Sequence, residues 1–137
     1  MRAAGRPTSV PTALEHDRAN VERAYELGLD QIANGEYFAA HELLEEAWRA
    51  AESDERDFFQ GLVHVAVAWY QAGRGNRVGC ERQLEKARRR LSPYAPAHRA
   101  LDVACVLDQL EAAEGHFPQL AQVRIRRLGP APEPPSG

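Results

Sequence analysis

One segment constrains the fold more than any other, because residues 55–72 carry apolar side chains around most of a helical circumference. A helix that is apolar on nearly all sides must be covered by other elements of the protein. We therefore expect this segment to be the central, buried helix of a helical bundle. Its apolar residues are Phe58, Phe59, Leu62, Val63, Val65, Ala66, Val67, Trp69 and Tyr70.

Four other segments show the apolar spacing of amphipathic helices, which predicts an all-α fold, a compact bundle of about five helices. A chain of 137 residues suggests one domain, and we expect it over residues 12–128. Residues 1–11 and the proline-rich tail, residues 129–137, are expected to be disordered, because proline interrupts helices and sheets. The helices are expected over residues 13–33, 37–51, 55–72 and 77–91, with a fifth beginning after Asp102 as N-cap.

The ends of these segments carry further signals. Thr12 precedes the first helix, and Ser53 and Asp54 precede the third; such side chains accept hydrogen bonds from free N–H groups at a helix start. Beyond the fifth helix, residues 123–126 alternate apolar and charged side chains. That alternation predicts an extended strap across the bundle.

An internal repeat relates two parts of the chain. A glycine, a small residue, a leucine, a glutamate and an alanine recur forty residues later with the same spacing. The spacing resembles the second helix of a tetratricopeptide repeat, although the period is longer than thirty-four residues. We therefore expect two repeat-like helical hairpins plus a C-terminal helix. The matching residues are Gly35, Ala40, Leu44, Glu45 and Ala47 in one copy and Gly75, Cys80, Leu84, Glu85 and Ala87 in the other.

The first hairpin carries a polar pair that the second lacks. His41 and Glu45 border the apolar side of the second helix, beside Trp48, and side chains four residues apart are neighbours on a helix. Arg49 follows Trp48 in the sequence. The hairpin therefore offers an imidazole, a carboxylate and a large aromatic ring in one place.

The central helix carries a polar strip of its own, formed by Asp57, Gln60, His64 and Gln71. A buried polar group without a partner costs a few kcal/mol, so the strip must find partners. If the second and third helices form a hairpin, this strip can face His41 and Glu45. The candidate site then consists of two imidazoles, one carboxylate and an amide, with Trp48 and Arg49 nearby.

Three interpretations of this cluster stay open. It can be a hydrogen-bonded network that fixes helix register. It can be a small-molecule or catalytic site, in which His41 is the general acid or base and Glu45 orients it. It can also hold a divalent metal at His41, Glu45 and His64, a ligand set that zinc accepts. The spacing matches no strong metal motif, so no metal ligand is assigned.

Net charge and cysteine content limit the kinds of partner and the cellular location that we expect. The net charge of −3 gives no reason to expect nucleic acid, and no stretch is apolar for long enough to span a membrane. The basic helix over residues 77–91 can be a docking surface for an acidic partner or a solvated face.

Cys80 and Cys105 are too few for a disulfide framework and are expected to be reduced and buried. With no export signal visible, we expect a cytoplasmic protein.

Particular motifs connect the chain to a known family. Residues 35–49 carry His41, Glu45 and Trp48 in the order His-x-x-x-Glu-x-x-Trp, and residues 56–64 contain an aromatic residue followed by x-Gln-Gly-Leu. With residues 75–87 and 101–103, these segments resemble the DUF309 family of small, all-helical, mainly bacterial and archaeal proteins of unknown function. The resemblance covers residues 20–115 and implies a helical bundle with a site at His41 and Glu45.

Two positions depart from the family pattern. Gln71 follows Tyr70 where family members often have histidine, which weakens any need for a third imidazole. Ala100 stands before Leu101 where members often have glycine. We therefore expect that the turn before the fifth helix does not require a positive φ.

Two function classes remain. One is a polar site for an unknown small molecule around His41 and Glu45, with hydrolytic or proton-transfer chemistry if the protein is an enzyme. The other is a non-enzymatic protein-interaction module with tetratricopeptide-like hairpins, in which the His/Glu cluster is structural. The sequence also leaves a homodimer open, through the outer face of the first or fifth helix.

Overall fold

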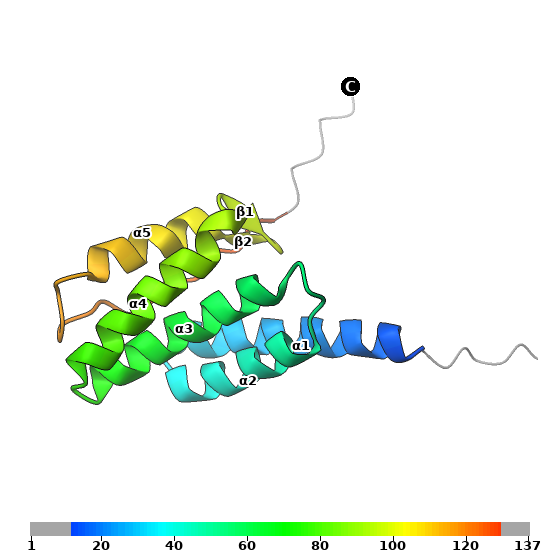
Figure 1. The fold of residues 1–137 in the computed structure, drawn as a ribbon, viewed down its shortest axis with the longest axis horizontal. Coiled ribbons are helices and arrows are strands. Elements are labelled where there is room, and N and C mark those ends of the chain that lie inside the picture. Colours follow the sequence, from blue (N-terminus) through cyan, green and yellow to red (C-terminus); the bar gives the residue numbers. More distant parts are fainter. Residues whose placement is uncertain (1–11, 130–137) are drawn as a thin grey trace, which may run out of the picture.

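The computed structural model describes residues 12–129. The segments expected to be disordered, 1–11 and 129–137, lie outside the described residues apart from Gly129. The described part is all-α, as predicted, with five helices and one small sheet (Figure 1). The helices are α1 (Ala13–Ala33), α2 (Tyr37–Ala50), α3 (Arg56–Gly73), α4 (Arg77–Leu91) and α5 (Val103–Ala113).

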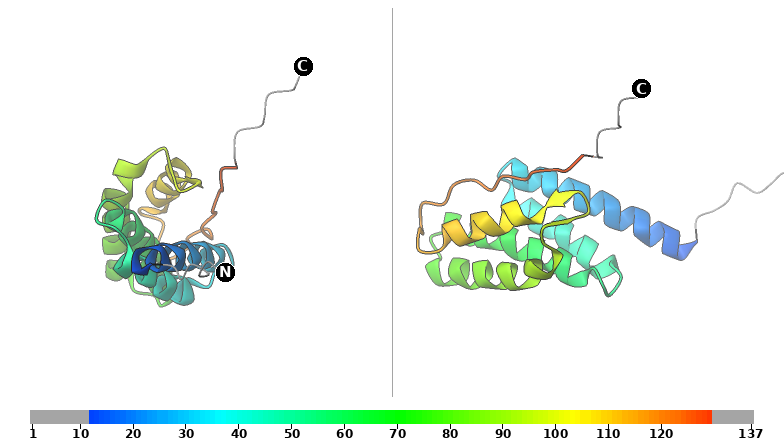
Figure 2. Two further views of the ribbon diagram at one scale, coloured as in Figure 1. Left: turned by 90° about the vertical axis from the view of Figure 1, so that its right-hand side faces the viewer. Right: turned by 90° about the horizontal axis from the view of Figure 1, so that it is seen from above.

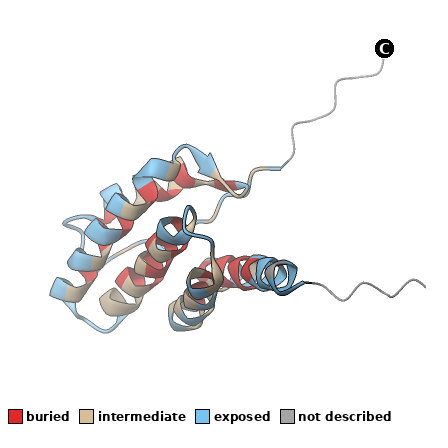
Figure 3. Ribbon diagram, turned by 45° about the vertical axis from the view of Figure 1, so that its right-hand side comes forward, coloured by how far each residue is buried: buried red, intermediate tan, exposed pale blue. Residues whose placement is uncertain are grey.

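Helix α3 is the central element. It packs against α2 on one side and α4 on the other, while α1 packs against α2. Viewed end-on, the helices follow one another in chain order around an arc, and the C-terminal segment lies on the open side of that arc (Figure 2). The inner surfaces of the helices carry the buried residues (Figure 3). The prediction of two helical hairpins around a buried central helix is confirmed.

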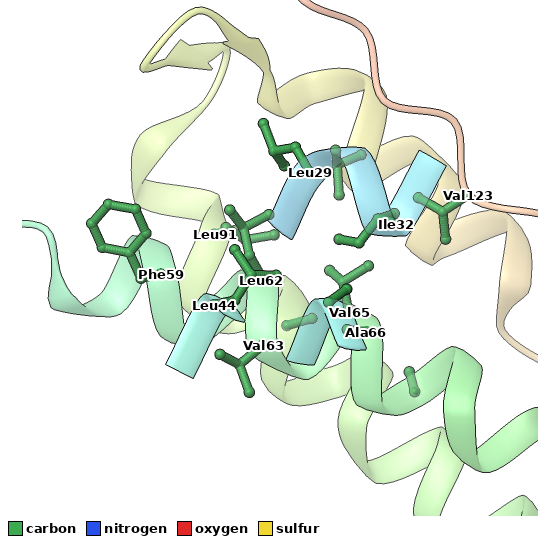
Figure 4. Close-up of a cluster of buried hydrophobic side chains, with 14 of the residues drawn as sticks. Leu29, Ile32, Leu44, Phe59, Leu62, Val63, Val65, Ala66, Leu91 and Val123 are labelled. Atoms are coloured by element: carbon green, nitrogen blue, oxygen red, sulfur yellow. The ribbon is translucent and has the colours of Figure 1, made fainter. Parts of the chain in front are cut away.

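The core is one continuous cluster that draws on all five helices (Figure 4). The rings of Tyr25, Phe58 and Phe59 contact one another, with centroids 5.2 to 5.8 Å apart. A glycine lets α3 and α4 approach closely, because a Cβ atom on Gly61 would lie 2.6 Å from Cγ of Leu91. Leucine therefore fills the space that the missing side chain leaves.

Two of the helices begin with the N-caps that the sequence predicts, and one does not. Thr12 accepts a hydrogen bond from the backbone N–H of Glu15, and the Glu15 carboxylate accepts one from Thr12 in return. Asp102 caps α5 by accepting from Cys105 N–H at 2.9 Å. The cap predicted from Ser53 and Asp54 is wrong. Glu55 precedes α3 without a side-chain cap, since its carboxylate is bonded elsewhere.

A small hairpin between α4 and α5 was not predicted. After a 3₁₀ turn, η1 (Ser92–Tyr94), strands β1 (Ala97–His98) and β2 (Leu101–Asp102) pair antiparallel. The two residues that connect them have φ of 48° at Arg99 and 59° at Ala100. A type I′ turn, which matches the strand twist, has positive φ at both of its central residues.

The expectation that this turn does not require a positive φ is therefore wrong. Each non-glycine residue in this conformation costs about 1–2 kcal/mol. Contacts of the turn with the rest of the protein must offset that cost. The Tyr25 hydroxyl supplies one of them by donating to the Arg99 carbonyl at 2.9 Å.

Residues 120–128 form an extended segment, here called the C-terminal strap, which confirms the predicted strap. It crosses the open side of the arc (Figure 2). Val123 is 2% exposed within the core cluster, whereas Arg124 and Arg126 are exposed. The alternation in sequence thus reflects one side of the strap packing inward.

Two further expectations can be compared with the structure. Both cysteines are free; Cys80 is buried as expected, but Cys105 is only half-buried, so that part of the expectation is wrong. Within residues 12–129, none of the helices is long and apolar enough to cross a bilayer.

The close contact at Gly61 leads to a stability prediction. Gly61→Ala forces Leu91 to move, so we expect the free energy of unfolding to fall by about 1–3 kcal/mol. Gly73→Ala, at the end of the same helix, meets no atom within 4 Å. We expect that variant to be unchanged or more stable by up to about 1 kcal/mol. Urea unfolding of both variants is the measurement, and equal losses would contradict the close-packing explanation.

Candidate functional site

The polar pair predicted on α2 is present. His41 Nε2 lies 3.2 Å from Glu45 Oε1, and Arg49 donates to the other oxygen of the same carboxylate at 3.1 Å. The three side chains are spaced one helical turn apart. The side chains of His41 and Glu45 are 24% and 33% exposed. Glu45 therefore joins an imidazole and a guanidinium in a row along the surface of α2.

Aromatic rings lie at one end of this row. The ring of Phe38 is 5.5 Å from that of His41 and 5.3 Å from that of Tyr70, which α3 contributes. The Arg74 guanidinium lies 5.5 Å from the Tyr70 ring and donates to its hydroxyl at 3.1 Å. We call Phe38, His41, Tyr70 and Arg74 the aromatic patch. It joins the start of α2 to the end of α3.

Trp48 lies at the other end of the row and contacts a cation. The guanidinium of Arg56 lies 5.0 Å from the centre of its ring, and Trp48 is half-buried against the core. Arg56 begins α3 and Trp48 is near the end of α2. One end of the α2–α3 pair is thus bridged by the ring contact between Phe38 and Tyr70, and the other by the contact between Trp48 and Arg56.

The polar strip of α3 faces α4 instead of α2. His64 Nδ1 lies 2.6 Å from Gln83 Oε1, and Arg90 donates to Asp57 at 2.6 Å. Residues seven apart fall on the same side of a helix, and this side packs on α4. Burial lowers the pKa of the His64 imidazole below its ordinary value.

The expected meeting of two imidazoles is therefore wrong. Among the described residues, none of the side-chain hydrogen bonds links His41 or Glu45 to His64, and Gln60 is half-buried. Within residues 12–129 no three His, Cys, Asp or Glu side chains are placed to hold a metal ion. A divalent metal at His41, Glu45 and His64 is not supported, because His64 is directed at α4.

A second polar cluster was missed by sequence reasoning. Arg99, in the turn with positive φ, donates to both oxygens of Glu55 at 2.6 and 2.7 Å and to Glu22 at 2.8 Å. His98 Nε2 lies 2.8 Å from Glu55. Hydrogen bonds from Arg99, and then from His98, hold the pKa of the Glu55 carboxyl below its ordinary value.

This cluster had no local sequence signal. Arg99 is 44 residues from Glu55 and 77 from Glu22. Its guanidinium also lies 5.1 Å from the Phe59 ring. Arg99 thus anchors the strained turn against α1 and the start of α3, which explains how the fold tolerates positive φ at that position.

The family model of DUF309, a domain of unknown function, matches residues 25–83. Residues 25–83 are a DUF309 domain. The family resemblance is thereby confirmed over that segment, which includes the His41–Glu45 pair, Trp48 and the polar strip of α3. The β1–β2 hairpin, α5 and the C-terminal strap lie outside the matched residues. No curated protein and no solved structure matches the chain.

The half-exposed pair in the DUF309 domain leads to a second prediction. We expect His41→Ala and Glu45→Ala each to lower the free energy of unfolding by about 0.3–1 kcal/mol, as for partly exposed pairs on one helix. Glu42→Ala, on the exposed side of the same helix, is the control and is expected to change little. Chemical denaturation is the measurement. Losses of about 2 kcal/mol or more in both variants would indicate a buried structural network instead.

The Glu55 cluster leads to a prediction about pH. The pKa of Glu55 is lower in the folded than in the unfolded chain, so its ionised form stabilises the fold at neutral pH. That contribution is lost as pH falls through the folded-state pKa. We expect Glu55→Gln to lower stability at neutral pH and to weaken the decline of stability toward about pH 3.

The matched control is Glu85→Gln on α4. Its carboxylate is 73% exposed and lies 3.6 Å from Arg89, so its removal should leave the acid dependence unchanged. Urea unfolding across the pH range measures both variants. If the free energy of unfolding declined equally toward low pH in Glu55→Gln and in the unsubstituted chain, the stabilising role of the ionised Glu55 carboxylate would be contradicted.

Proposed function

We propose that the chain is a non-enzymatic protein-interaction module that docks a partner on the outer side of α2 and α3, over the aromatic patch. The observation that carries this proposal is the exposure of Phe38. This ring is 50% exposed, although it contacts two other rings. A contiguous exposed apolar patch with a polar rim is typical of interaction surfaces, and the Phe38 ring is continuous with the half-buried Tyr70 ring and with Arg74 at its edge.

The composition of the patch also favours a protein partner. Aromatic residues and arginine are enriched among the residues that dominate binding energy at protein interfaces. Tyr70 and Arg74 are held together by a hydrogen bond, and Phe38 packs beside Tyr70. Because these side chains already contact one another, they would lose little conformational entropy when a partner binds.

The shape of the surface supports the same proposal. Four of the hollows in the described part of the chain have volumes of about 240 to 400 Å³. None of these four is lined by His41, Glu45 or Phe38. Small-molecule sites are concave and enclose most of their ligand, whereas an open strip along two helices suits a protein surface.

A polar small-molecule site at His41 and Glu45 is the second candidate. The bond between His41 Nε2 and the Glu45 carboxylate favours it, because a carboxylate that orients an imidazole is a common arrangement in proton transfer. In that function His41 is the acid or base and Glu45 the orienting group, with hydrolytic or proton-transfer chemistry. We also propose a cytoplasmic location, since both cysteines are free.

A photo-crosslinking experiment tests the interaction function. A photoreactive phenylalanine is placed at position 38, and in a matched chain at position 78, where Val78 is 59% exposed on α4. We expect a discrete adduct with one protein from position 38 and none from position 78 in cells that produce the chain. Tyr70→Ala should reduce the adduct at position 38.

Two outcomes would overturn the interaction function. Equal labelling from positions 38 and 78 would show nonspecific contact, and absence of a protein adduct from position 38 would leave the patch without a protein partner. The second candidate is then examined by NMR titration of the His41 imidazole against small-molecule libraries. A compound that shifts the His41 signals and is lost in Glu45→Gln would favour the small-molecule site.

A further inference from the structure

A cavity of about 400 Å³ lies between α3, α5 and the C-terminal strap. The Gln109 side chain of α5 donates to the Arg124 carbonyl at 2.8 Å and accepts from its N–H at 2.7 Å, so α5 and the strap are joined side by side (Figure 2). The Trp69 indole of α3 donates to the Ala121 carbonyl at 2.8 Å. Hydrogen bonds to the strap backbone thus fix the walls of this cavity, here called the α5 cavity.

The inner wall of the α5 cavity is apolar. Trp69, which is 6% exposed, and the buried Ala113 form part of it, and Leu120 packs against the core beside the cavity. Cavities that bind small molecules have volumes of roughly 300–1,000 Å³ and mostly apolar walls. The α5 cavity therefore suits an apolar or aromatic group about as large as an amino-acid side chain.

Two side chains of opposite charge line the same cavity. Arg124 of the strap and Asp108 of α5 are both exposed. Among residues 12–129, no ion pair joins them to each other or to a third side chain, whereas Arg127 of the same strap is paired with Glu26. The α5 cavity thus offers one cation and one anion whose charges are not neutralised within the fold.

Two uncharged polar groups add to this set. His116 lines the cavity, and its Nδ1 lies 3.0 Å from the Glu114 carbonyl. A carbonyl only accepts, so Nδ1 carries the hydrogen and Nε2 of the neutral ring is an acceptor. The amide of Gln119, which also lines the cavity, can donate. Acceptors at Asp108 and His116 suit an ammonium group, and donors at Arg124 and Gln119 suit a carboxylate.

We propose that the α5 cavity binds a free apolar amino acid. Its side chain lies against Trp69 and Leu120, its carboxylate meets Arg124 and its ammonium group meets Asp108. A ligand with a carboxylate alone would be repelled by Asp108, and one with an amine alone would be repelled by Arg124. Only a ligand that carries both charges is attracted by both side chains. This cavity lies apart from the aromatic patch, so the inference goes beyond the proposed function and does not rest on it.

Isothermal titration calorimetry with the full-length chain tests the class of ligand. We expect L-phenylalanine or L-leucine to bind with a Kd below about 1 mM. Phenylpropionate, which lacks the ammonium group, and L-phenylalanine amide, which lacks the carboxylate, should each bind at least about tenfold more weakly than L-phenylalanine.

Matched variants assign each charge of the ligand. Arg124→Ala should weaken the binding of L-phenylalanine at least about tenfold and leave the binding of its amide unchanged. Asp108→Asn should weaken the binding of L-phenylalanine and should not weaken that of phenylpropionate. Both side chains are exposed, so neither variant should impair folding.

The fluorescence of Trp69 locates the bound ligand. The chain has two tryptophans, and Trp48 does not line the cavity, so Trp48→Phe leaves Trp69 as the reporter. L-phenylalanine should change its emission with the same Kd. Ala112→Phe fills the cavity from an exposed position of α5 and should abolish binding, whereas Glu111→Phe, exposed beside it and outside the cavity lining, should not.

Three outcomes would overturn the amino-acid site. Absence of binding by both L-phenylalanine and L-leucine at millimolar concentration would exclude the ligand class. Equal affinity for L-phenylalanine, its amide and phenylpropionate would exclude recognition by Arg124 and Asp108. Undiminished binding to Ala112→Phe would exclude the α5 cavity as the place of binding.

Discussion

The burial of α3 on nearly all sides is the constraint on which the rest of the structure depends. A helix with nine buried residues needs neighbours on more than one face. Helices α2 and α4 cover its two flanks, and α1, α5 and the C-terminal strap close the remaining side. The order of the helices around the arc follows from this requirement and from short connections, which make consecutive helices neighbours.

The β1–β2 turn and the C-terminal strap are held to the helical arc by long-range polar contacts as well as by apolar burial. Arg99 ties the β1–β2 turn to α1 and α3, and Arg127 ties the strap to α1. Both arginines hold segments that have few backbone partners in regular structure. The strained backbone at Arg99 and Ala100 persists because the surrounding contacts over-determine it.

Because α3 lies between α2 and α4, the structure separates two sets of polar residues that the sequence predicts to form one site. On α2, His41 and Glu45 remain near the surface beside the exposed ring of Phe38. On α3, Asp57 and His64 are used to hold α4, since α3 lies between its two neighbours. The DUF309 domain therefore contains one partly exposed polar pair on α2 and one polar strip on α3 whose Asp57 and His64 bond α4.

The sequence by itself determined the helices, their approximate ends, the repeat of hairpins and the strap, because apolar periodicity and capping residues are local signals. It also determined that His41 and Glu45 are neighbours, since four residues make one helical turn. Only the tertiary structure decided that His64 bonds Gln83 and that Glu55 turns to Arg99 instead of capping α3. The tertiary structure alone also decided that Ala100 has a positive φ. These features depend on which face of a helix meets which neighbour and on contacts between residues distant in the chain. An angular offset of a fraction of a turn between α3 and its two flanking helices is enough to redirect a side chain from one partner to another.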